Sequence, residues 1–220
     1  MTYYFLVMSN LSTPQPKQAR AKETIDLLIK ATDRAMREGG ESAVRIQELS
    51  DATGVSIGSI YHHFGDRDGL IRATHAHNFA SVIAADIPRV KEFISRMSST
   101  AEMAEHYEEM LNFVKSHFSV QSALERAAIV GNTAGRPKLQ QELGEVQTQL
   151  TDGVTEVMVI AQERNMLKEH LNPRAAATVM LGILFGKAIA ELDNNPVSEH
   201  DWSRAMLSAF GGMLVIREGN

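Results

Sequence analysis

Apolar residues recur every three or four positions along most of this chain, which is the spacing of one face of an α-helix. Glycine and proline interrupt the pattern and mark where the expected helices end. The first third of the chain therefore predicts four helices: Ala19 to about Glu38, Ile46 to Thr53, a two-turn helix that ends before Gly65, and Arg67 to about Ala85, which Pro88 terminates.

The remainder of the chain is also expected to be helical almost throughout. Two glycines in its longest helix, Gly144 and Gly153, are positions where another element can approach closely or where the helix can bend. The expected helices are a short one around Val90 to Met97, Ala101 to Phe118, Val120 to about Val130, Lys138 to Arg164, Arg174 to Leu192, and Glu199 to Ile216. The predicted fold class is all-α.

The turn chemistry between Gly54 and Gly65 is the most informative local feature. Glycine accepts the left-handed conformation that ends helices, so Gly54 is expected to stop the helix before it. Ser56 then offers a side-chain oxygen that can cap the next helix, which has room for only about two turns. Two short helices joined by a tight, glycine-containing turn predict a helix-turn-helix, whose second helix enters a DNA major groove.

The same stretch resembles the DNA-binding signature of TetR-type transcriptional regulators, over roughly Ala21 to Thr74. The residues that carry the resemblance are Gly54-Val55-Ser56, Gly58-Ser59-Ile60-Tyr61, His63-Phe64 and Asp66-Arg67-Asp68. Beyond this region only the layout of helices is similar to the family. The resemblance implies an N-terminal three-helix DNA-binding domain followed by a helical domain for ligand binding and dimerisation.

The resemblance also implies how the side chains of the motif divide their work. Val55, Ile60 and Phe64 are expected to pack in the small core, and Asp66 is expected to cap the fourth helix. Tyr61, His63 and Arg67 resemble the family's backbone-contacting positions and are expected to bind phosphate, whereas Ser56, Ile57, Ser59 and His62 are left to face bases. Arg45 completes the predicted DNA-binding set. Ile57 stands where the family commonly has Lys or Arg, so it can contact a thymine methyl but cannot donate to guanine.

Charge and composition are compatible with this interpretation. The net charge is -5, but residues 14–75 carry nine basic and nine acidic side chains, so the negative excess lies entirely beyond residue 75. Lys17, Arg20 and Lys22 form a local basic cluster that can bind phosphate. The chain has no cysteine, which fits a reducing compartment, and no apolar run reaches about 18 residues, so a cytoplasmic protein without a membrane span is expected. Met1 to Met8 does not resemble a secretory signal, and Met8 is an alternative start.

The expected domain limits are 1–18 for a flexible arm, 19–66 for the DNA-binding domain with a connecting helix at 67–85, and 67–220 for the helical body.

Methionines and aromatic residues in the middle helices indicate an adaptable pocket for an apolar or aromatic effector, although core residues would look the same. The predicted ligand-binding residues are Met103, Tyr107, Met110, Phe113 and Met158. The family resemblance implies that the last two helices dimerise, and the predicted interface residues are Ala176, Met180, Ile183, Leu184, Met206, Phe210 and Met213.

No catalytic or metal-binding motif is recognisable. His62-His63 and His75-x-His77 lack an accompanying carboxylate cluster, and no nucleophile elbow, phosphate-binding glycine loop or dinucleotide fingerprint is present. No cofactor is expected. We therefore predict a non-enzymatic homodimer that binds a palindromic operator in double-stranded DNA, with repression implied by the family resemblance. The alternatives are a nucleoid or division-type DNA-binding protein that answers to a protein partner, and a helical ligand carrier or enzyme.

Overall fold

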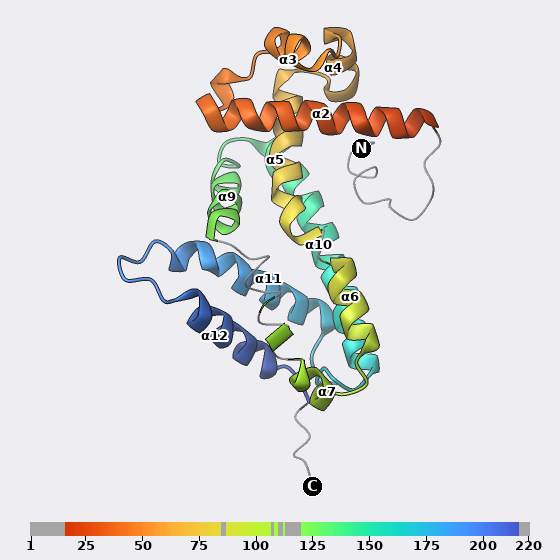
Figure 1. Ribbon diagram of the computed structural model, residues 1–220, viewed down its shortest axis with the longest axis vertical. Coiled ribbons are helices and arrows are strands. Elements are labelled where there is room, and N and C mark those ends of the chain that lie inside the picture. Colours follow the sequence, from red (N-terminus) through yellow and green to blue (C-terminus); the bar gives the residue numbers. More distant parts are fainter. Residues whose placement is uncertain (1–15, 85–86, 107, 110–111, 113–119, 216–220) are drawn as a thin grey trace. The chain divides into compact units, whose positions relative to one another are not determined.

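The computed structural model describes residues 16–84, 87–106, 108–109, 112 and 120–215. Over these residues the chain is helical, and the only β pairing is an isolated bridge between Leu167 and Leu214, so the all-α prediction is confirmed. The elements (Figure 1) are α2 (Pro16–Gly39), η1 (Glu41–Ala43), α3 (Ile46–Thr53), α4 (Ile57–Phe64), α5 (Arg67–Ala84), α6 (Ile87–Arg96), α7 (Thr100–Glu105), α9 (Val120–Gly131), α10 (Pro137–Glu163), α11 (Pro173–Ala190) and α12 (Glu199–Gly211).

The chain divides into two compact units, here called the head (Met1–Asn78) and the body (Phe79–Asn220). The division falls inside α5, the helix expected to connect two domains. The limits 1–18, 19–66 and 67–220 stay a prediction.

The core of the head is a single apolar cluster to which α2, α3, α4 and α5 all contribute. Ile60 and Leu28 are fully buried in it, and Val55 and Phe64 pack against it while remaining half-buried. The core roles expected of Val55, Ile60 and Phe64 are therefore confirmed. The remaining buried members of the cluster are Val44, Leu49, Leu70 and Ile71.

The body is organised around α10, the longest helix, which packs against both α6 and α11. Its apolar stripe is buried along its whole length, with Leu139, Leu143, Val146, Leu150, Val154 and Val157 all in the interior. At Gly153 of this helix, an added Cβ atom would lie 2.9 Å from the side chain of Ile87. Helix α6 therefore approaches α10 closely at this glycine, which is the first of the two expectations for Gly153. No atom lies within 4 Å of a Cβ placed at Gly144.

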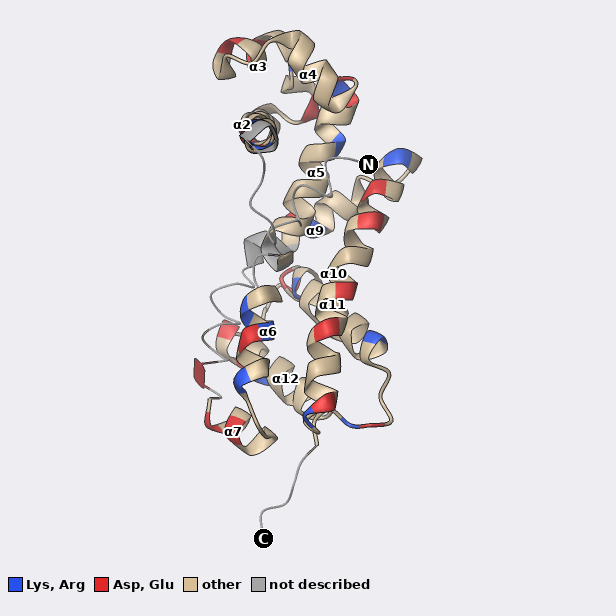
Figure 2. Ribbon diagram, turned by 90° about the vertical axis from the view of Figure 1, so that its right-hand side faces the viewer, with Lys and Arg blue, Asp and Glu red and all other residues tan. Residues whose placement is uncertain are grey.

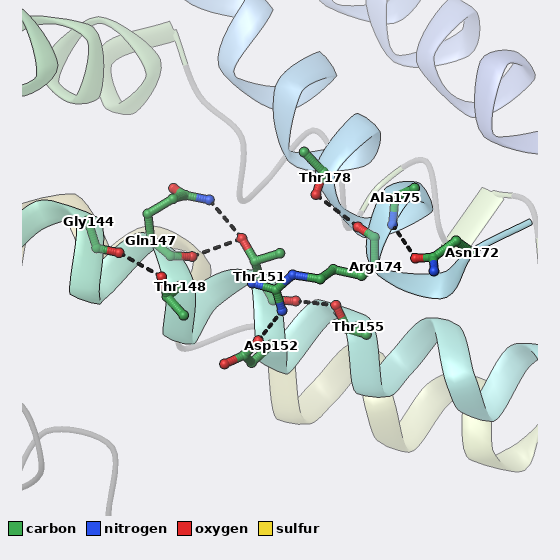
Figure 3. Close-up of polar contacts among 10 residues, drawn as sticks. All are labelled: Gly144, Gln147, Thr148, Thr151, Asp152, Thr155, Asn172, Arg174, Ala175 and Thr178. Atoms are coloured by element: carbon green, nitrogen blue, oxygen red, sulfur yellow. Dashed lines mark hydrogen bonds and ion pairs between the residues drawn. The ribbon is translucent and has the colours of Figure 1, made fainter.

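One ion pair joins α10 and α11, and the other polar contacts in Figure 3 lie within α10 or at the start of α11. Arg174 at the start of α11 forms an ion pair with Asp152 of α10, and Asn172 caps α11 by accepting from the Ala175 N–H at 3.0 Å. Along α10, the hydroxyls of Thr148, Thr151 and Thr155 each donate to the carbonyl four residues earlier. Such bonds satisfy hydroxyls on a helix without requiring another element, at a small cost to helix stability.

The structure departs from the expected helices in three places. Of the helix expected over Ala101 to Phe118, the part described as α7 ends at Glu105 with His106 as its C-cap, because the His106 N–H donates to the Met103 carbonyl with three-residue rather than helical spacing. Residues 107, 110–111 and 113–118 of the expected helix lie outside the described residues. Pro88 lies within the first turn of α6 instead of ahead of it. Proline is tolerated there because the N–H groups of the first turn have no partner within the helix. The helix expected to reach Ile216 ends at Gly211, after which Met213 and Val215 exchange backbone bonds with residues 166–168.

By length and composition, α11 could cross a membrane, a test that the core helices of soluble proteins also pass. It packs against α9 and α10 and buries Lys187, which is 2% exposed. The Lys187 Nζ lies 2.6 Å from a Glu191 carboxylate oxygen and 3.2 Å from one of Glu199, and it stands 5.3 Å from the Trp202 ring centroid. Burial by itself would lower the pKa of Lys187, but these two carboxylates outweigh it and raise the pKa above its ordinary value.

Candidate nucleic-acid interface

The turn between α3 and α4 has the geometry of a helix-turn-helix. Gly54 ends α3 in the left-handed conformation, with φ of 71°, and its N–H donates to the Ser50 carbonyl at 2.8 Å. Ser56 then caps α4, since its Oγ accepts from the Ser59 N–H at 3.2 Å. Both predictions from sequence, the glycine stop and the serine cap, are confirmed. α4 is thereby held to eight residues, with a defined start beside α3.

The turn after α4 is equally constrained. Gly65 adopts φ of 79°, and its N–H donates to the Tyr61 carbonyl at 2.8 Å. Asp66 caps α5 as expected, because its Oδ1 accepts from the Gly69 N–H at 2.6 Å. A Cβ atom added at Gly69 would overlap the Phe64 carbonyl oxygen, so the α4–α5 turn closes only around a residue without a side chain.

Six of the predicted DNA-binding residues lie on α4 or, in the case of Ser56, at its N-cap. Ile60 points into the core, whereas Ser56 and His62 are exposed and Tyr61 is 44% exposed. Ile57, Ser59 and His63 are half-buried. The structure thus gathers Ser56, Ile57, Ser59, Tyr61, His62 and His63 around one helix, and their contacts with DNA stay a prediction.

The two histidines of α4 lie with their ring centroids 5.4 Å apart. Partial burial, and next the neighbouring His62, lower the pKa of His63 below its ordinary value. At neutral pH the His63 ring is therefore uncharged, and it can act as a neutral hydrogen-bond donor but not as a cation.

The two arginines predicted to contact DNA have different surroundings. Arg45 precedes α3 without capping it, is exposed, and pairs with Glu48 at 3.1 Å. Arg67, at the first position of α5, instead donates its Nε to the Val44 carbonyl at 2.7 Å and a terminal nitrogen to the Glu41 carbonyl. Its guanidinium therefore satisfies main-chain acceptors of the segment between α2 and α3. A phosphate contact by Arg67 stays a prediction.

Two further polar residues of α5 also hold that region, and sequence reasoning did not identify them. His75 is buried and its Nε2 lies 2.7 Å from a Glu41 carboxylate oxygen, and Asn78 donates to Asp33 of α2 at 2.6 Å. These contacts bridge 34 and 45 residues of sequence. The sequence carried one available signal, namely polar side chains at positions that face inward on an otherwise apolar helix. α5 is thus fixed to α2 and η1 by three separate side chains.

Comparison with known proteins agrees with this geometry. The sequence model for bacterial regulatory proteins of the tetR family matches residues 28–74, which span the end of α2 through the first part of α5. A putative TetR-family transcriptional regulator from Mesorhizobium loti MAFF303099 shares the fold with a TM-score of 0.66 and 17% identity, over 90% of this chain and 99% of that one. The helix-turn-helix region of the chain thus matches the tetR family of bacterial regulatory proteins.

Two other comparisons show how far the likeness extends along the chain. The HTH-type transcriptional regulator BetI of Burkholderia thailandensis is 38% identical over 58 residues, which are 26% of this chain and 30% of that regulator. The match thus spans about a third of the curated relative's length. The regulator FadR of Bacillus subtilis, solved in complex with stearoyl-CoA, has the same fold with a TM-score of 0.55 and 18% identity, over 84% of this chain and 96% of that one.

The residues predicted to bind a ligand fall partly within the described residues of the body. Met103 is buried and Met158 is half-buried, and the structure brings both into one apolar cluster with Ile94 and Met97. Tyr107, Met110 and Phe113 lie outside the described residues. Whether this cluster lines a pocket or only forms core is not decided by these contacts, so the ligand role stays a prediction.

The residues predicted to form a dimer interface lie on or just beyond α11 and α12. Ala176, Leu184 and Met206 are buried by their own protomer, while Met180, Ile183, Phe210 and Met213 are half-buried. Sequence reasoning missed the apolar side chains that α11 exposes most, Val179 at 49% and Ile189 at 68%. Their signal was present, since both are apolar residues of the helix expected over Arg174 to Leu192.

Proposed function

We propose that this chain is a ligand-responsive, DNA-binding transcriptional regulator, most simply a repressor that releases a palindromic operator when a small molecule binds the body. The observation that carries the proposal is the α3–α4 pair, in which two defined caps present the outer face of α4. The match of residues 28–74 to the tetR family model supports the same function. The chain would act in the cytoplasm, without enzymatic activity.

Operator recognition would require two copies of α4. A homodimer that places them about 34–36 Å apart can read two half-sites separated by one turn of DNA. We propose that α11 and α12 form the interface through Met180, Ile183, Phe210 and Met213, with the exposed Val179 and Ile189 added to the predicted set. Ala176, Leu184 and Met206 would then support the interface from within each protomer.

Within each half-site, the side chains of α4 would divide into two groups. Tyr61, His63 and Arg45 would bind the phosphate backbone, and Ser56, Ile57, Ser59 and His62 would face base edges. Because Ile57 offers only apolar contact, methyl groups of thymine would contribute to recognition at its position.

An effector would act by favouring a body conformation that moves α5 and changes the spacing of the two α4 helices. A coupling of about 1–3 kcal/mol would change operator occupancy 5- to 150-fold. The stearoyl-CoA in the FadR complex is a ligand with a long apolar chain, which supports an effector with apolar character here.

Selection from random duplexes tests the proposal directly. The full chain would be incubated with a pool of 30-base-pair duplexes at moderate salt, and bound DNA would be sequenced over several rounds. We expect an enriched palindrome whose half-sites are centred about 10 base pairs apart. A dimer that enriches no sequence would contradict the proposal.

Variants of α4 separate the two groups of contacts. Tyr61→Phe should weaken binding to selected and unselected duplexes by a similar factor, about fivefold, because it removes one phosphate hydrogen bond. His62→Ala should instead lower the preference for the selected site over random DNA. The rival of a nucleoid or division-type protein would give many dispersed sites and no compound that releases DNA.

A further inference from the structure

Arg126 of α9 is a charged side chain in the interior of the body. It is 8% exposed, and its guanidinium carbon lies 4.1 Å from the centroid of the Phe79 ring. One terminal nitrogen donates to the Phe79 main-chain carbonyl. Burial lowers the pKa of Arg126 to about 10, which still leaves the group protonated at neutral pH.

No carboxylate among the described residues pairs with this guanidinium. Of the 27 acidic residues in the chain, all but Asp86 and Glu218 lie within the described ranges. Burial is the sole cause of the shift in the Arg126 pKa, as expected where no acidic group lies close by. A buried cation without an anion is unusual, because removing a charge from water is costly unless an opposite charge compensates for it.

The chain's other enclosed cations are compensated. Lys187, at 2% exposed, lies beside the carboxylates of Glu191 and Glu199. Arg72, whose side chain is 12% exposed, pairs with Asp68 one turn earlier on α5. Arg126 is therefore an exception within its own molecule, and the difference calls for an anion that the described chain does not supply.

The chemistry of the site narrows what that anion can be. A guanidinium carries five N–H donors in a planar fork that matches a carboxylate or a phosphate, and the Phe79 carbonyl accepts from one of its nitrogens. The Phe79 ring stacks beneath the charge, and Ile129, three residues further along α9, is also buried. An anionic group bound here would thus meet apolar surface beside its charged end.

We infer that Arg126 binds the anionic end of the effector, which is therefore an amphiphilic organic anion, a carboxylate or phosphate joined to an apolar portion. The inference rests on the proposed function of the body as a ligand sensor. It sharpens the expectation of an apolar or aromatic effector, because Arg126 adds one charged contact to an otherwise apolar environment. It also gives α9 a direct link to α5, since the group that binds the anion donates to the Phe79 carbonyl.

The competing explanation is that Arg126 only ties α9 to α5. Arg164 provides a matched control, since it also belongs to the body and donates a terminal nitrogen to a main-chain carbonyl, that of Met97, at 2.7 Å, but it is exposed to solvent. Arg164→Gln removes the same kind of hydrogen bond without removing a buried charge.

The test measures the binding of four eight-carbon probes to the full chain by calorimetry in the absence of DNA: octanoate, octyl phosphate, 1-octanol and octyltrimethylammonium. The chain should bind one or both anions about 10- to 100-fold more tightly than the alcohol, and the cation least tightly. Arg126→Gln should abolish the preference for anions over the alcohol, and Arg164→Gln should retain it. Comparing octanoate with octyl phosphate distinguishes the two anionic groups.

Several results would overturn the inference. The first is that the unmodified chain binds 1-octanol as tightly as both anions. The second is that Arg126→Gln still prefers the anions over 1-octanol. If Arg126→Gln does not fold, Arg126→Lys keeps the charge but not the planar fork, so the preference should shrink, and an unchanged preference would overturn the assignment. Anion preference in a chain that selects no DNA would contradict the regulator proposal alone, and selective DNA binding without anion preference would contradict the Arg126 assignment alone.

Discussion

The head and the body differ in how they treat buried polar groups. In the head, Thr32 and Thr74 donate to carbonyls of their own helices, and His75 lies against Glu41. In the body, Arg126 is enclosed without a carboxylate among the described residues. The buried polar groups of the head thus mostly bond within the protein, whereas the body encloses a guanidinium whose anion, on the proposal above, a ligand would supply. A surface that reads a fixed partner benefits from the first arrangement, and a sensor benefits from the second.

The surface charges follow the same division. Residues 14–75 are electrically balanced, while the negative excess lies in the rest of the chain. Figure 2 shows several acidic segments along α10, which carries Glu142, Glu145, Asp152, Glu156 and Glu163 against a single Lys138. An acidic body surface would not attract DNA, so contact with the duplex is directed to the neutral head and its basic side chains.

The largest effect is expected where the head closes its turn. Gly69→Ala forces a Cβ atom onto the Phe64 carbonyl oxygen and should destabilise the head by about 3 kcal/mol, because the main chain itself would have to shift. Hydrogen exchange of α3 and α4 reports this loss separately from the body. Gly58→Ala is the control, since nothing lies within 4 Å of its added Cβ and alanine favours a helix by roughly 0.5–1 kcal/mol. Equal protection of α3 and α4 in both variants would refute the close approach.

Within the body, the two enclosed cations should respond in opposite directions. Lys187→Met leaves Glu191 and Glu199 without their shared partner and should lower the free energy of unfolding by about 2 kcal/mol, moderated because Glu199 is 47% exposed. Arg126→Met removes an uncompensated charge and should raise it by about 1 kcal/mol. Urea titrations followed by the fluorescence of Trp202 measure both. A loss of stability in Arg126→Met comparable to that in Lys187→Met would remove the contrast between the two cations.

A smaller effect is expected at Arg67, which joins α5 to the segment between α2 and α3. Arg67→Gln should destabilise the head by about 1–2 kcal/mol, because it removes charge-assisted bonds to the Val44 and Glu41 carbonyls. DNA affinity measured over a range of salt concentrations shows whether Arg67 has a second role. If Arg67 also contacts phosphate, the salt slope should decrease by about one unit; if it only holds the fold, affinity should fall with the slope unchanged.

The smallest effect concerns His77, the head's one exception to complete internal contacts among the described residues. The His77 Nδ1 is buried without a hydrogen-bond partner. Burial lowers the pKa of His77, Lys30 lowers it further, and the charges of Asp26 and Asp33 oppose this shift without cancelling it. The folded state therefore resists protonation, so this contribution is intact above about pH 6.5 and is lost as the pH falls below that value. His77→Asn should reduce the loss of stability between pH 7.5 and 5 by less than about 1 kcal/mol. Parallel urea midpoints for the two proteins across this range would contradict it.

The parts of the molecule that could be predicted are those controlled by neighbouring residues. Gly54, Ser56 and Asp66 act on main-chain groups within four positions, so the bounds of α3 and α4 followed from local chemistry. The end of α12 could not be predicted in this way, because Val215 bonds to Met166, nearly fifty residues earlier in the chain. Local periodicity continued past Gly211, but the tertiary partner of the following residues determined their conformation.

Long side chains were the least predictable part of the candidate site. Arg67 resembles a phosphate-binding position in sequence, yet in the structure its acceptors lie 23 and 26 residues away. Arg126 gave no signal, because an arginine in an amphipathic helix normally reaches solvent, whereas here the tertiary packing of the body buries it against Phe79. The interior stripe of α11 was recognisable, but which apolar side chains remained exposed depended on the helices that cover it.

The contrast between Gly58 and Gly69 also bears on how a regulator of the kind proposed could acquire new operators. Gly69 cannot accept any side chain without moving the turn, whereas nothing lies within 4 Å of a Cβ atom added at Gly58. Mutations that change sequence preference can therefore accumulate at Ile57, Gly58, Ser59 and His62 while the turn behind them stays constant. A library built on those four positions would explore new DNA specificities at little risk to folding, and one that included Gly69 would consist mostly of unfolded heads.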